Sequence, residues 1–249
     1  MPMKPLKLLR ILTLAAAALA THAEASVIIA GTRIIFPSSE REVTIQLTND
    51  GKRPALVQAW IDDGDRNALP EQIDVPFTLA PAMFRMEPGN GQTLRVMHTG
   101  QPLPADKESL FWLNVLEVPP KATADDNPNR IQLAFRSRIK IMYRPASLKG
   151  DANAAPAQLD WRVVRADGGR YALQATNPTP YVVNLGSVTL KSAGHKFDAG
   201  SGYVLPGAAQ RFPIKDLAAA PAAGASVEFG TINDWGASTD IERPVSVAP

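Results

Sequence analysis

The sequence predicts an all-β protein in which an immunoglobulin-like sandwich is followed by a second, looser β domain. Short runs with apolar residues at alternate positions recur along the chain, and clusters of Gly, Pro, Asn and Asp separate them about every ten residues. No segment of the mature chain shows a convincing helical period. Residues 145–156 are rich in Ala, Asn, Asp, Gly and Pro, and we interpret them as a domain boundary.

The first half contains the most regular strand patterns. Residues 43–48 alternate Val, Ile and Leu with Thr and Gln, and Asn49-Asp50-Gly51 then provides a turn. Similar runs occupy residues 55–61, 92–97 and 110–118. Together with a run at residues 131–143, about seven short strands fit into about 120 residues, which is the strand count of an immunoglobulin-like sandwich.

The strand expected at residues 131–143 carries more cations than a buried strand needs. One set of alternate positions holds large apolar residues, namely Ile131, Leu133, Phe135, Ile139, Ile141 and Tyr143. The other set includes four basic residues, namely Arg136, Arg138, Lys140 and Arg144. This period of two predicts a half-buried strand whose basic face meets water or an anion.

The second half repeats the β pattern less regularly. Strands are expected at residues 158–164, 171–177, 182–190 and 226–232. The Ala-rich residues 217–225 allow a short helix or a loop. We expect a loop, because Pro221 and Gly224 interrupt the segment.

Residues 1–25 have the pattern of a secretory signal peptide. A basic start precedes an apolar run at residues 11–20, and Ala23-Glu24-Ala25 provides a cleavage pattern. The run is shorter than the roughly 20 residues that span a bilayer. We therefore expect an exported, soluble chain that begins near Ser26 and has no membrane anchor. The sequence contains no cysteine, which excludes disulfides and thiol chemistry.

The charge balance and the histidines argue against nucleic-acid binding and metal catalysis. The totals of 26 basic and 24 acidic residues become 23 of each without residues 1–25, whereas a dedicated nucleic-acid-binding domain is clearly basic. His98 and His195 have no partner at metal-ligand spacing. We expect them to be surface or packed residues, and we expect no nucleic-acid partner.

Other chemical motifs are incomplete. No G-x-S-x-G sequence occurs, and Gly89-Asn90-Gly91 is more simply a hairpin turn than part of a phosphate loop. Asp62, Asp63 and Asp65 lack the later glutamate of a calcium loop, so we expect a solvated turn there. The sequence therefore predicts a protein that is not an enzyme and has no cofactor or metal.

Several blocks of the first half occur in an order that is specific to one family. They are GTRIIF at residues 31–36, LTNDGKRPALVQAW at 47–60, PADKESLFWLNVLEVPP at 104–120 and IQLAFRSRIKIMYRP at 131–145, with TINDWG at 231–236. In these blocks the chain resembles the PapD-like periplasmic chaperones of the chaperone–usher pilus pathway. The resemblance implies two immunoglobulin-like β-sandwich domains in a boomerang arrangement, at residues 26–145 and 146–249.

The resemblance also implies a function. Chaperones of this family hold exported pilin subunits that lack a final strand, and they fill the gap with the last strand of their first domain. Pilin subunits and an outer-membrane usher are then the expected partners, in the periplasm. Ile131, Leu133 and Phe135 are the expected groove-filling residues. Alternation alone also allows all three to face the protein's own core.

Two basic residues match an anchor in the family. Arg33 and Lys140 correspond to the pair that binds the C-terminal carboxylate of the subunit in the interdomain cleft. Without the resemblance, two solvated strand cations would be the simpler interpretation. Lys140 belongs to the other set of alternate positions from the groove-filling residues. Either a regular strand points it away from them, or a bulge intervenes.

Three charged residues, Glu108, Arg144 and Asp234, match those that fix the angle between the domains in the family. Taken alone, they would be ordinary surface charges. Many relatives have a disulfide in the second domain, which this cysteine-free chain cannot form. The short segment at residues 121–129 resembles that of the short-loop branch of the family.

Two other functions remain open on the sequence. A secreted two-domain immunoglobulin-like adhesin or surface-binding protein would reach the outside of the cell instead of staying in the periplasm. A hydrolase would need catalytic residues that the sequence does not offer. An exposed apolar edge strand invites pairing, so a capped homodimer of the free protein is also compatible with the sequence.

Overall fold

The computed structural model describes residues 26–120, 132–217 and 219–247. The proposed signal peptide, the whole segment at residues 121–129 and Ile131 lie outside the described residues. Within the described part, no helix has the length and apolar character required to cross a membrane. The helices among these residues are short 3-10 turns at Pro70–Gln72, Ala155–Gln158 and Asp167–Gly169, and the fold is all-β, as predicted.

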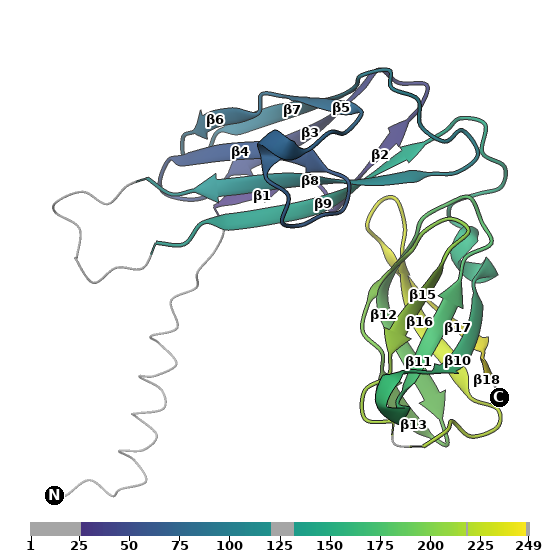
Figure 1. Cartoon of the computed structure of the whole chain (residues 1–249). Coiled ribbons are helices and arrows are strands. Elements are labelled where there is room, and N and C mark those ends of the chain that lie inside the picture. The colour runs from purple at the N-terminus through teal and green to yellow at the C-terminus, as the bar shows by residue number, and fades with distance from the viewer. Residues whose placement is uncertain (1–25, 121–131, 218, 248–249) are drawn as a thin grey trace, which may run out of the picture.

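The first domain is a sandwich of two sheets (Figure 1). One sheet has the order β1-β3-β7-β5, with β1 at Val27–Ile29, β3 at Glu42–Asn49, β7 at Gly91–His98 and β5 at Phe77–Ala80. The other has the order β2-β9-β8-β4-β6, with β2 at Arg33–Pro37, β9 at Phe135–Arg144, β8 at Ser109–Val118, β4 at Ala55–Asp62 and β6 at Met83–Met86.

The second domain repeats this architecture. One sheet has the order β15-β11-β10-β18, with β15 at Ala209–Pro213, β11 at Tyr171–Thr176, β10 at Asp160–Arg165 and β18 at Ser246–Val247. The other has the order β13-β12-β16-β17, with β13 at His195–Asp198, β12 at Val183–Ser192, β16 at Ser226–Ile232 and β17 at Ser238–Pro244. The short strand β14 at Gly202–Val204 also pairs with β12.

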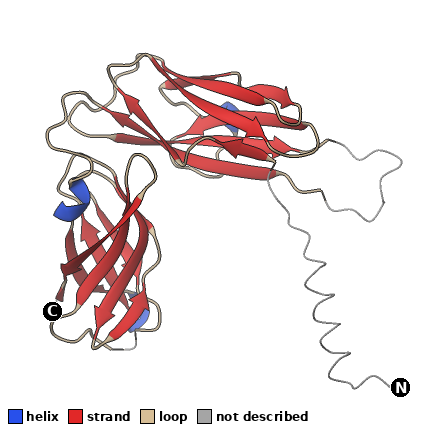
Figure 2. Ribbon diagram, turned by 180° about the vertical axis from the view of Figure 1, so that it is seen from behind, coloured by secondary structure: helices blue, strands red, loops and turns tan. Residues whose placement is uncertain are grey.

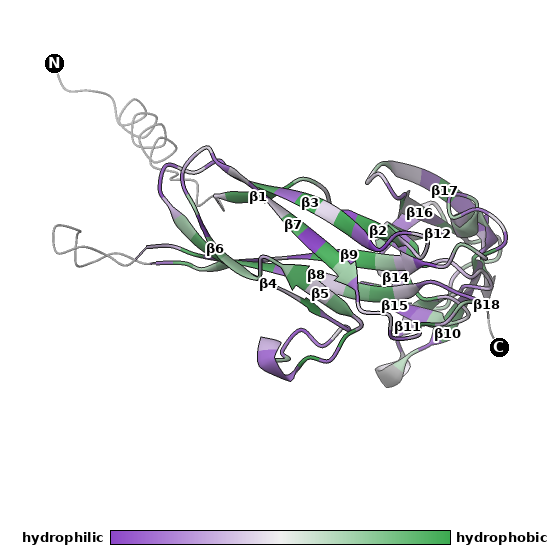
Figure 3. Ribbon diagram, turned by 90° about the horizontal axis from the view of Figure 1, so that it is seen from above, coloured by the Kyte–Doolittle hydropathy of each residue, from purple (hydrophilic) through white to green (hydrophobic). Residues whose placement is uncertain are grey.

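Alternating burial explains why these segments are strands. In β3, Ile45 and Leu47 are buried while Thr44 and Gln46 are exposed, as the period of two predicts. Figure 3 shows hydrophobic and hydrophilic residues alternating along strands of the first domain. Each domain has its own apolar core, centred on residues such as Phe36, Leu47, Leu94, Leu113 and Ile141 in the first and Trp161, Leu173, Val188, Leu190 and Phe229 in the second.

The two sandwiches meet at one end of each and give the molecule a bent shape (Figures 1 and 2). The chain passes directly from β9 into the corner between them. Near the start of the first domain it changes sheets between β1 and β2, and Gly31 permits this with a φ of 144° that favours glycine. This change places Arg33 at the start of β2, beside β9.

The structure differs from the predicted strands at element ends and in several short strands that were not predicted. The strand expected at residues 131–143 begins at Phe135, where its pairing with β8 begins. The alternation predicted neither the short strands β1 and β2 nor the hairpin strands β5, β6, β13, β14, β15 and β17. The described residues of 217–225 contain no helix.

Candidate functional site

The strand β9 brings Arg33 and Lys140 together. The strand β2 pairs with β9 in parallel, with Arg33 directly opposite Lys140. On its other side, β9 pairs with β8 in unbroken register from Phe135 to Tyr143. No bulge intervenes, so Lys140 and Phe135 remain on opposite faces of a regular strand.

One half of β9 has an open edge. The strand β2 covers only residues 140–144 of β9, and no other described strand pairs with that edge at residues 135–139. Leu133 is 53% exposed, and Phe135 is half-buried at the start of the strand. Further along the same face, Ile141 lies in the core. Leu133 therefore does not face the protein's own core, and an unpaired backbone edge runs beside Phe135.

The side chain of Lys140 reaches across to the second domain. Its Nζ donates a hydrogen bond of 2.6 Å to Asn184 Oδ1. The same nitrogen lies 4.6 Å from the ring centroid of Tyr203 and 5.4 Å from that of Trp112. Burial, and then the nearby charge of Arg33, lower the pKa of Lys140 to about 8.

Arg33 also contacts the second domain. Its Nη1 donates to the carbonyl oxygen of Ile232 at 3.0 Å. Burial lowers the pKa of Arg33, and the charge of Asp234 partly offsets this effect. Within the described part of the chain, neither Arg33 nor Lys140 forms an ion pair with a carboxylate. The two cations therefore form a positive site in which a single anion could contact both of them.

Glu108, Arg144 and Asp234 meet at the corner between the domains. Arg144 Nε donates to Glu108 Oε1 at 2.5 Å, and its two Nη atoms donate to the Asp234 carboxylate at 2.6 and 2.9 Å. The backbone N–H of Val182 donates to Glu108 Oε2 at 2.7 Å. Burial lowers the pKa of Arg144, but the bonds to Asp234 and Glu108 outweigh it and raise the pKa above its ordinary value.

The remaining cations of β9 are already engaged. Arg138 forms an ion pair with Asp62, which also accepts hydrogen bonds from Asn114 and from the backbone of Gly64. Asp62 is 1% exposed, so the prediction that its cluster is a solvated turn is wrong for this residue. Burial acts to raise the pKa of Asp62, but the bonds from Arg138 and Asn114 reverse the shift and lower it.

Sequence reasoning did not identify the residues that surround Lys140 in the second domain. Asn184 and Tyr203 lie in no motif, and they come together because they are opposite each other in the pairing of β12 with β14. Trp112 lies within a family block, but its position beside the lysine depends on the register of β8 with β9. No pattern within one strand could have revealed this cluster.

The two histidines of the described residues, His98 and His195, lie in different surroundings. His98 stacks on Tyr143 at a centroid distance of 5.0 Å and contacts the ring of Phe77 edge-on. His195 lies exposed at the start of β13. Among the described residues, no group of His, Asp or Glu side chains could hold a metal ion.

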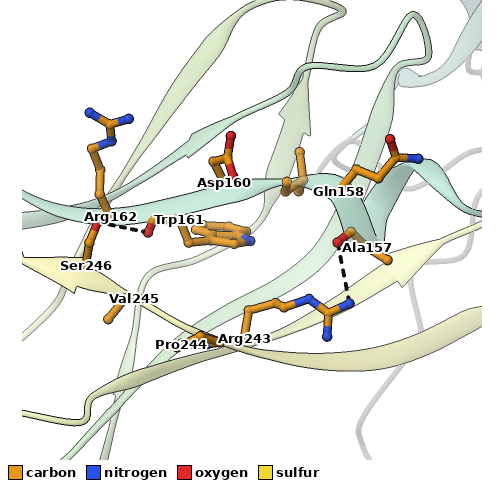
Figure 4. A pocket seen from close by; sticks show the side chains of 10 residues that line it. Ala157, Gln158, Asp160, Trp161, Arg162, Arg243, Pro244, Val245 and Ser246 are labelled. Atoms are coloured by element: carbon orange, nitrogen blue, oxygen red, sulfur yellow. Dashed lines mark hydrogen bonds between the residues drawn. The ribbon is translucent and has the colours of Figure 1, made fainter.

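A separate pocket lies in the second domain, between β10 and the segment from β17 to β18 (Figure 4). Trp161 lies against it with its Nε1 buried and without a hydrogen-bond partner. The side chain of Arg243 crosses it and donates to the carbonyl oxygen of Ala157 at 3.4 Å. None of the residues around Lys140 or Arg144 lines this pocket.

Comparison with known proteins gives matches along both domains. Residues 26–149 match the model of the pili and flagellar-assembly chaperone PapD N-terminal domain, and residues 154–243 match that of the pili assembly chaperone PapD C-terminal domain. The Bordetella pertussis chaperone protein FimB/FhaD is 41% identical over 234 residues, which cover 92% of each chain. The probable fimbrial chaperone YadV of Escherichia coli is 42% identical over 219 residues, 87% of this chain and 88% of the relative.

Solved structures agree with these matches. The crystal structure of the YadV chaperone superimposes with a TM-score of 0.76 and 37% identity, covering 88% of this chain and 100% of that one. A chain of the complex between the SafA pilin and the SafB chaperone of Salmonella enterica also matches. Its TM-score is 0.71 at 25% identity, with coverage of 90% of this chain and 98% of that one.

Proposed function

Because the chain belongs to the PapD family of pilus-assembly chaperones, we propose that it binds pilin subunits in the periplasm and delivers them to an outer-membrane usher. The observation that carries the proposal is the open edge of β9 beside the cation pair of Arg33 and Lys140. An incomplete subunit presents an unpaired strand edge and a free C-terminal carboxylate. This one surface of the chaperone is complementary to both.

The geometry also supports one direction for the bound strand. If the terminal carboxylate of the subunit lies at Lys140, the residues before it run along the open edge from Phe135 towards Ile139. The last subunit strand is then parallel to β9. The strand β2 is also parallel to β9 and pairs with the same edge from Lys140 onward. The bound strand would therefore lie in line with β2. Backbone pairing of this kind tolerates many subunit sequences.

Apolar side chains before and at the start of β9 supply the second part of the interaction. We propose that Leu133 and Phe135, together with Ile131, fill the groove left by the missing strand of the subunit. The exposure of Leu133 supports this role, because about half of its apolar surface is open to solvent in the free protein. Burying each such side chain contributes roughly 1.5–3 kcal/mol before the costs of association.

The network of Glu108, Arg144 and Asp234 is proposed to fix the angle between the domains, taken as residues 26–145 and 146–249. Arg144 belongs to the first domain, while Asp234 and the N–H of Val182 belong to the second. Charge-assisted, bidentate bonds of this kind restrict orientation more strongly than single neutral bonds. The contacts of Arg33 and Lys140 with the second domain depend on this angle.

The proposed action requires no catalysis. Transfer of a subunit would be driven by replacing the donated strand with a better-packed strand of another subunit, so no nucleotide is needed. A secreted adhesin is disfavoured, because the matches to chaperones extend over both domains. Cell fractionation tests the location. Accumulation outside the cell instead of in the periplasm would contradict the proposal.

The open edge also bears on the free protein. An unpaired strand with exposed apolar residues invites pairing with a second copy, so we propose a capped homodimer in the absence of subunits. Sedimentation velocity over a concentration series would detect it. A strictly monomeric protein at all concentrations would overturn this part of the proposal.

Co-expression with a pilin encoded in the same gene cluster tests the main proposal. We expect Arg33→Ala and Lys140→Ala to remove most of the subunit recovered with the chaperone from the periplasm. Arg85→Ala is the matched control, since Arg85 is an exposed strand arginine paired with Glu87. Undiminished recovery with both anchor variants would show that the anchor is wrongly assigned.

A further inference from the structure

Lys140 belongs to the first domain, but its ammonium group is held by the second. Asn184 Oδ1 accepts its hydrogen bond at 2.6 Å, and the Tyr203 ring lies 4.6 Å from its Nζ. We propose that Asn184 and Tyr203 are positioning residues that hold this ammonium ready for a subunit carboxylate, so that the two domains form the anchor jointly. The inference rests on the proposed function, because it concerns the same carboxylate.

Asn184 and Tyr203 act as one unit of the second domain. They are directly opposite each other in the antiparallel pairing of β12 and β14, and directly opposed residues project from the same face of a sheet. Asn184 is 6% exposed, and its Nδ2 points to the sulfur of Met142 at 3.5 Å. This contact directs the amide oxygen towards Lys140.

The aromatic rings restrict the ammonium without neutralising it. The rings of Trp112 and Tyr203 meet edge to face at 5.8 Å, and both lie close to the Lys140 Nζ. Ring faces attract a cation and exclude water, but they carry no net charge. An ammonium group has three donors, and Asn184 uses one of them. Two donors are left for a carboxylate.

The chemistry of Asn184 matters as much as its position. An aspartate there would form an ion pair with Lys140 and compete with an incoming carboxylate. The amide orients the lysine through one hydrogen bond and leaves its charge uncompensated. Burial, and then the charge of Arg33, lower the pKa of Lys140 to about 8, as expected for an ammonium group with no anionic partner among the described residues.

This position also reduces the cost of binding. A free lysine side chain occupies many rotamers and loses that freedom when it binds a ligand. Here Asn184 and the two rings already restrict the side chain, so less conformational freedom is lost when the carboxylate binds. Any change that moves the second domain away from β9 would remove this benefit and weaken the anchor.

The test uses two synthetic peptides that differ only at their C-terminus. Both alternate valine and threonine behind a lysine-rich solubilising tag, and one ends in a free carboxylate while the other ends in an amide. Calorimetric titration of the purified full-length protein gives the ratio of the two affinities. A purely structural defect would weaken the binding of both peptides equally. A positioning defect would lower the ratio of the affinity for the free acid to the affinity for the amide.

We expect the unmodified protein to prefer the free acid. Asn184→Leu and Tyr203→Leu should reduce this preference roughly tenfold, the equivalent of one lost charge-assisted hydrogen bond. Asn184→Asp, which is isosteric, should abolish it by supplying an internal carboxylate. Tyr203→Phe keeps the ring and should leave the ratio unchanged. Thermal unfolding identifies any variant that does not fold, and the isosteric Asn184→Asp then carries the test.

The outcomes separate the two proposals. If the unmodified protein binds acid and amide equally, or binds neither, the proposed strand donation with a carboxylate anchor is wrong. If it prefers the acid but Asn184→Asp and Tyr203→Leu prefer it equally strongly, the anchor stands and the positioning role of the second domain is wrong.

Discussion

Arg33 lies directly opposite Lys140, where β2 begins to pair with β9. Two cations on neighbouring strands repel each other, and in the described part of the chain neither has a carboxylate partner. The pair therefore costs stability in the free protein, and an anion that bridges both cations would relieve the cost. At this site, stability and binding are opposed.

Replacing the lysine should make this opposition measurable. We expect Lys140→Met to raise the free energy of unfolding at neutral pH by about 1–2 kcal/mol, since each unit of lowered pKa corresponds to roughly 1.4 kcal/mol and the lost bond to Asn184 offsets part of the gain. Urea denaturation measures the change. Lys215→Met is the control, because this exposed lysine pairs with Asp198 and should change stability by less than about 0.5 kcal/mol. A clear loss of stability in Lys140→Met would contradict the expectation.

The pH dependence of binding follows from the same residue. Burial lowers the pKa of Lys140 to about 8, and a bound carboxylate would raise it again because opposite charge favours the ammonium form. Binding of a free C-terminus then takes up a proton above that pH. The affinity should therefore be full well below pH 8 and should fall as the pH rises through 8 and beyond.

A titration series with free-acid and amidated peptides checks this dependence. The amidated peptide should show little change over the same range. Lys140→Arg should remove the decline for the acid, because a guanidinium group stays protonated. An affinity for the free acid that is constant up to pH 10 in the unmodified protein would show that Lys140 does not titrate at the anchor.

The corner network should couple the unfolding of the two domains. Glu108 is 3% exposed, and Glu108→Ala would leave Arg144 and the N–H of Val182 without this partner. We expect a loss of about 3–5 kcal/mol and a separation of the two domain transitions in calorimetry. Asp234→Ala should lower the free energy of unfolding by less, because the Asp234 side chain is partly exposed. Glu87→Ala, in an exposed pair, should change little. A single unshifted transition for Glu108→Ala would exclude the coupling.

Local alternation predicted the well-buried strands because their pattern reflects one buried face. The strands β3, β4, β7 and β8 were anticipated in this way. The start of β9 was not, because residues 131–134 continue the alternation beyond Phe135, the residue at which the pairing with β8 stops. A strand extends only as far as it is paired, and the alternation of one segment carries no information about its partner.

The candidate site depended even more on tertiary structure. Family resemblance singled out Arg33 and Lys140, whereas periodicity alone favoured solvated cations. Asp62 was expected in water, yet it is buried and forms an ion pair with Arg138, which lies two strands away in the sheet. Asn184 and Tyr203 reach the lysine only through the pairing of β12 with β14 and the docking of the two domains. Such relationships between distant strands are not encoded in any single segment.

The apolar residues near the start of β9 provide a test that separates binding from folding. Leu133 is 53% exposed, whereas Ile141, on the same side of the strand pattern, is fully buried in the core. We expect Leu133→Ser to reduce pilin recovery from the periplasm strongly while the urea midpoint stays within the error of the unmodified protein. Ile141→Ser should instead destabilise the domain by at least about 2–5 kcal/mol, because it removes core packing and buries a hydroxyl group.

Phe135→Ser, at a half-buried position, should resemble Leu133→Ser in binding and lose only about 1 kcal/mol in stability. If Phe135→Ser were as unstable as Ile141→Ser, Phe135 would belong to the protein's own core and could not be a groove-filling residue.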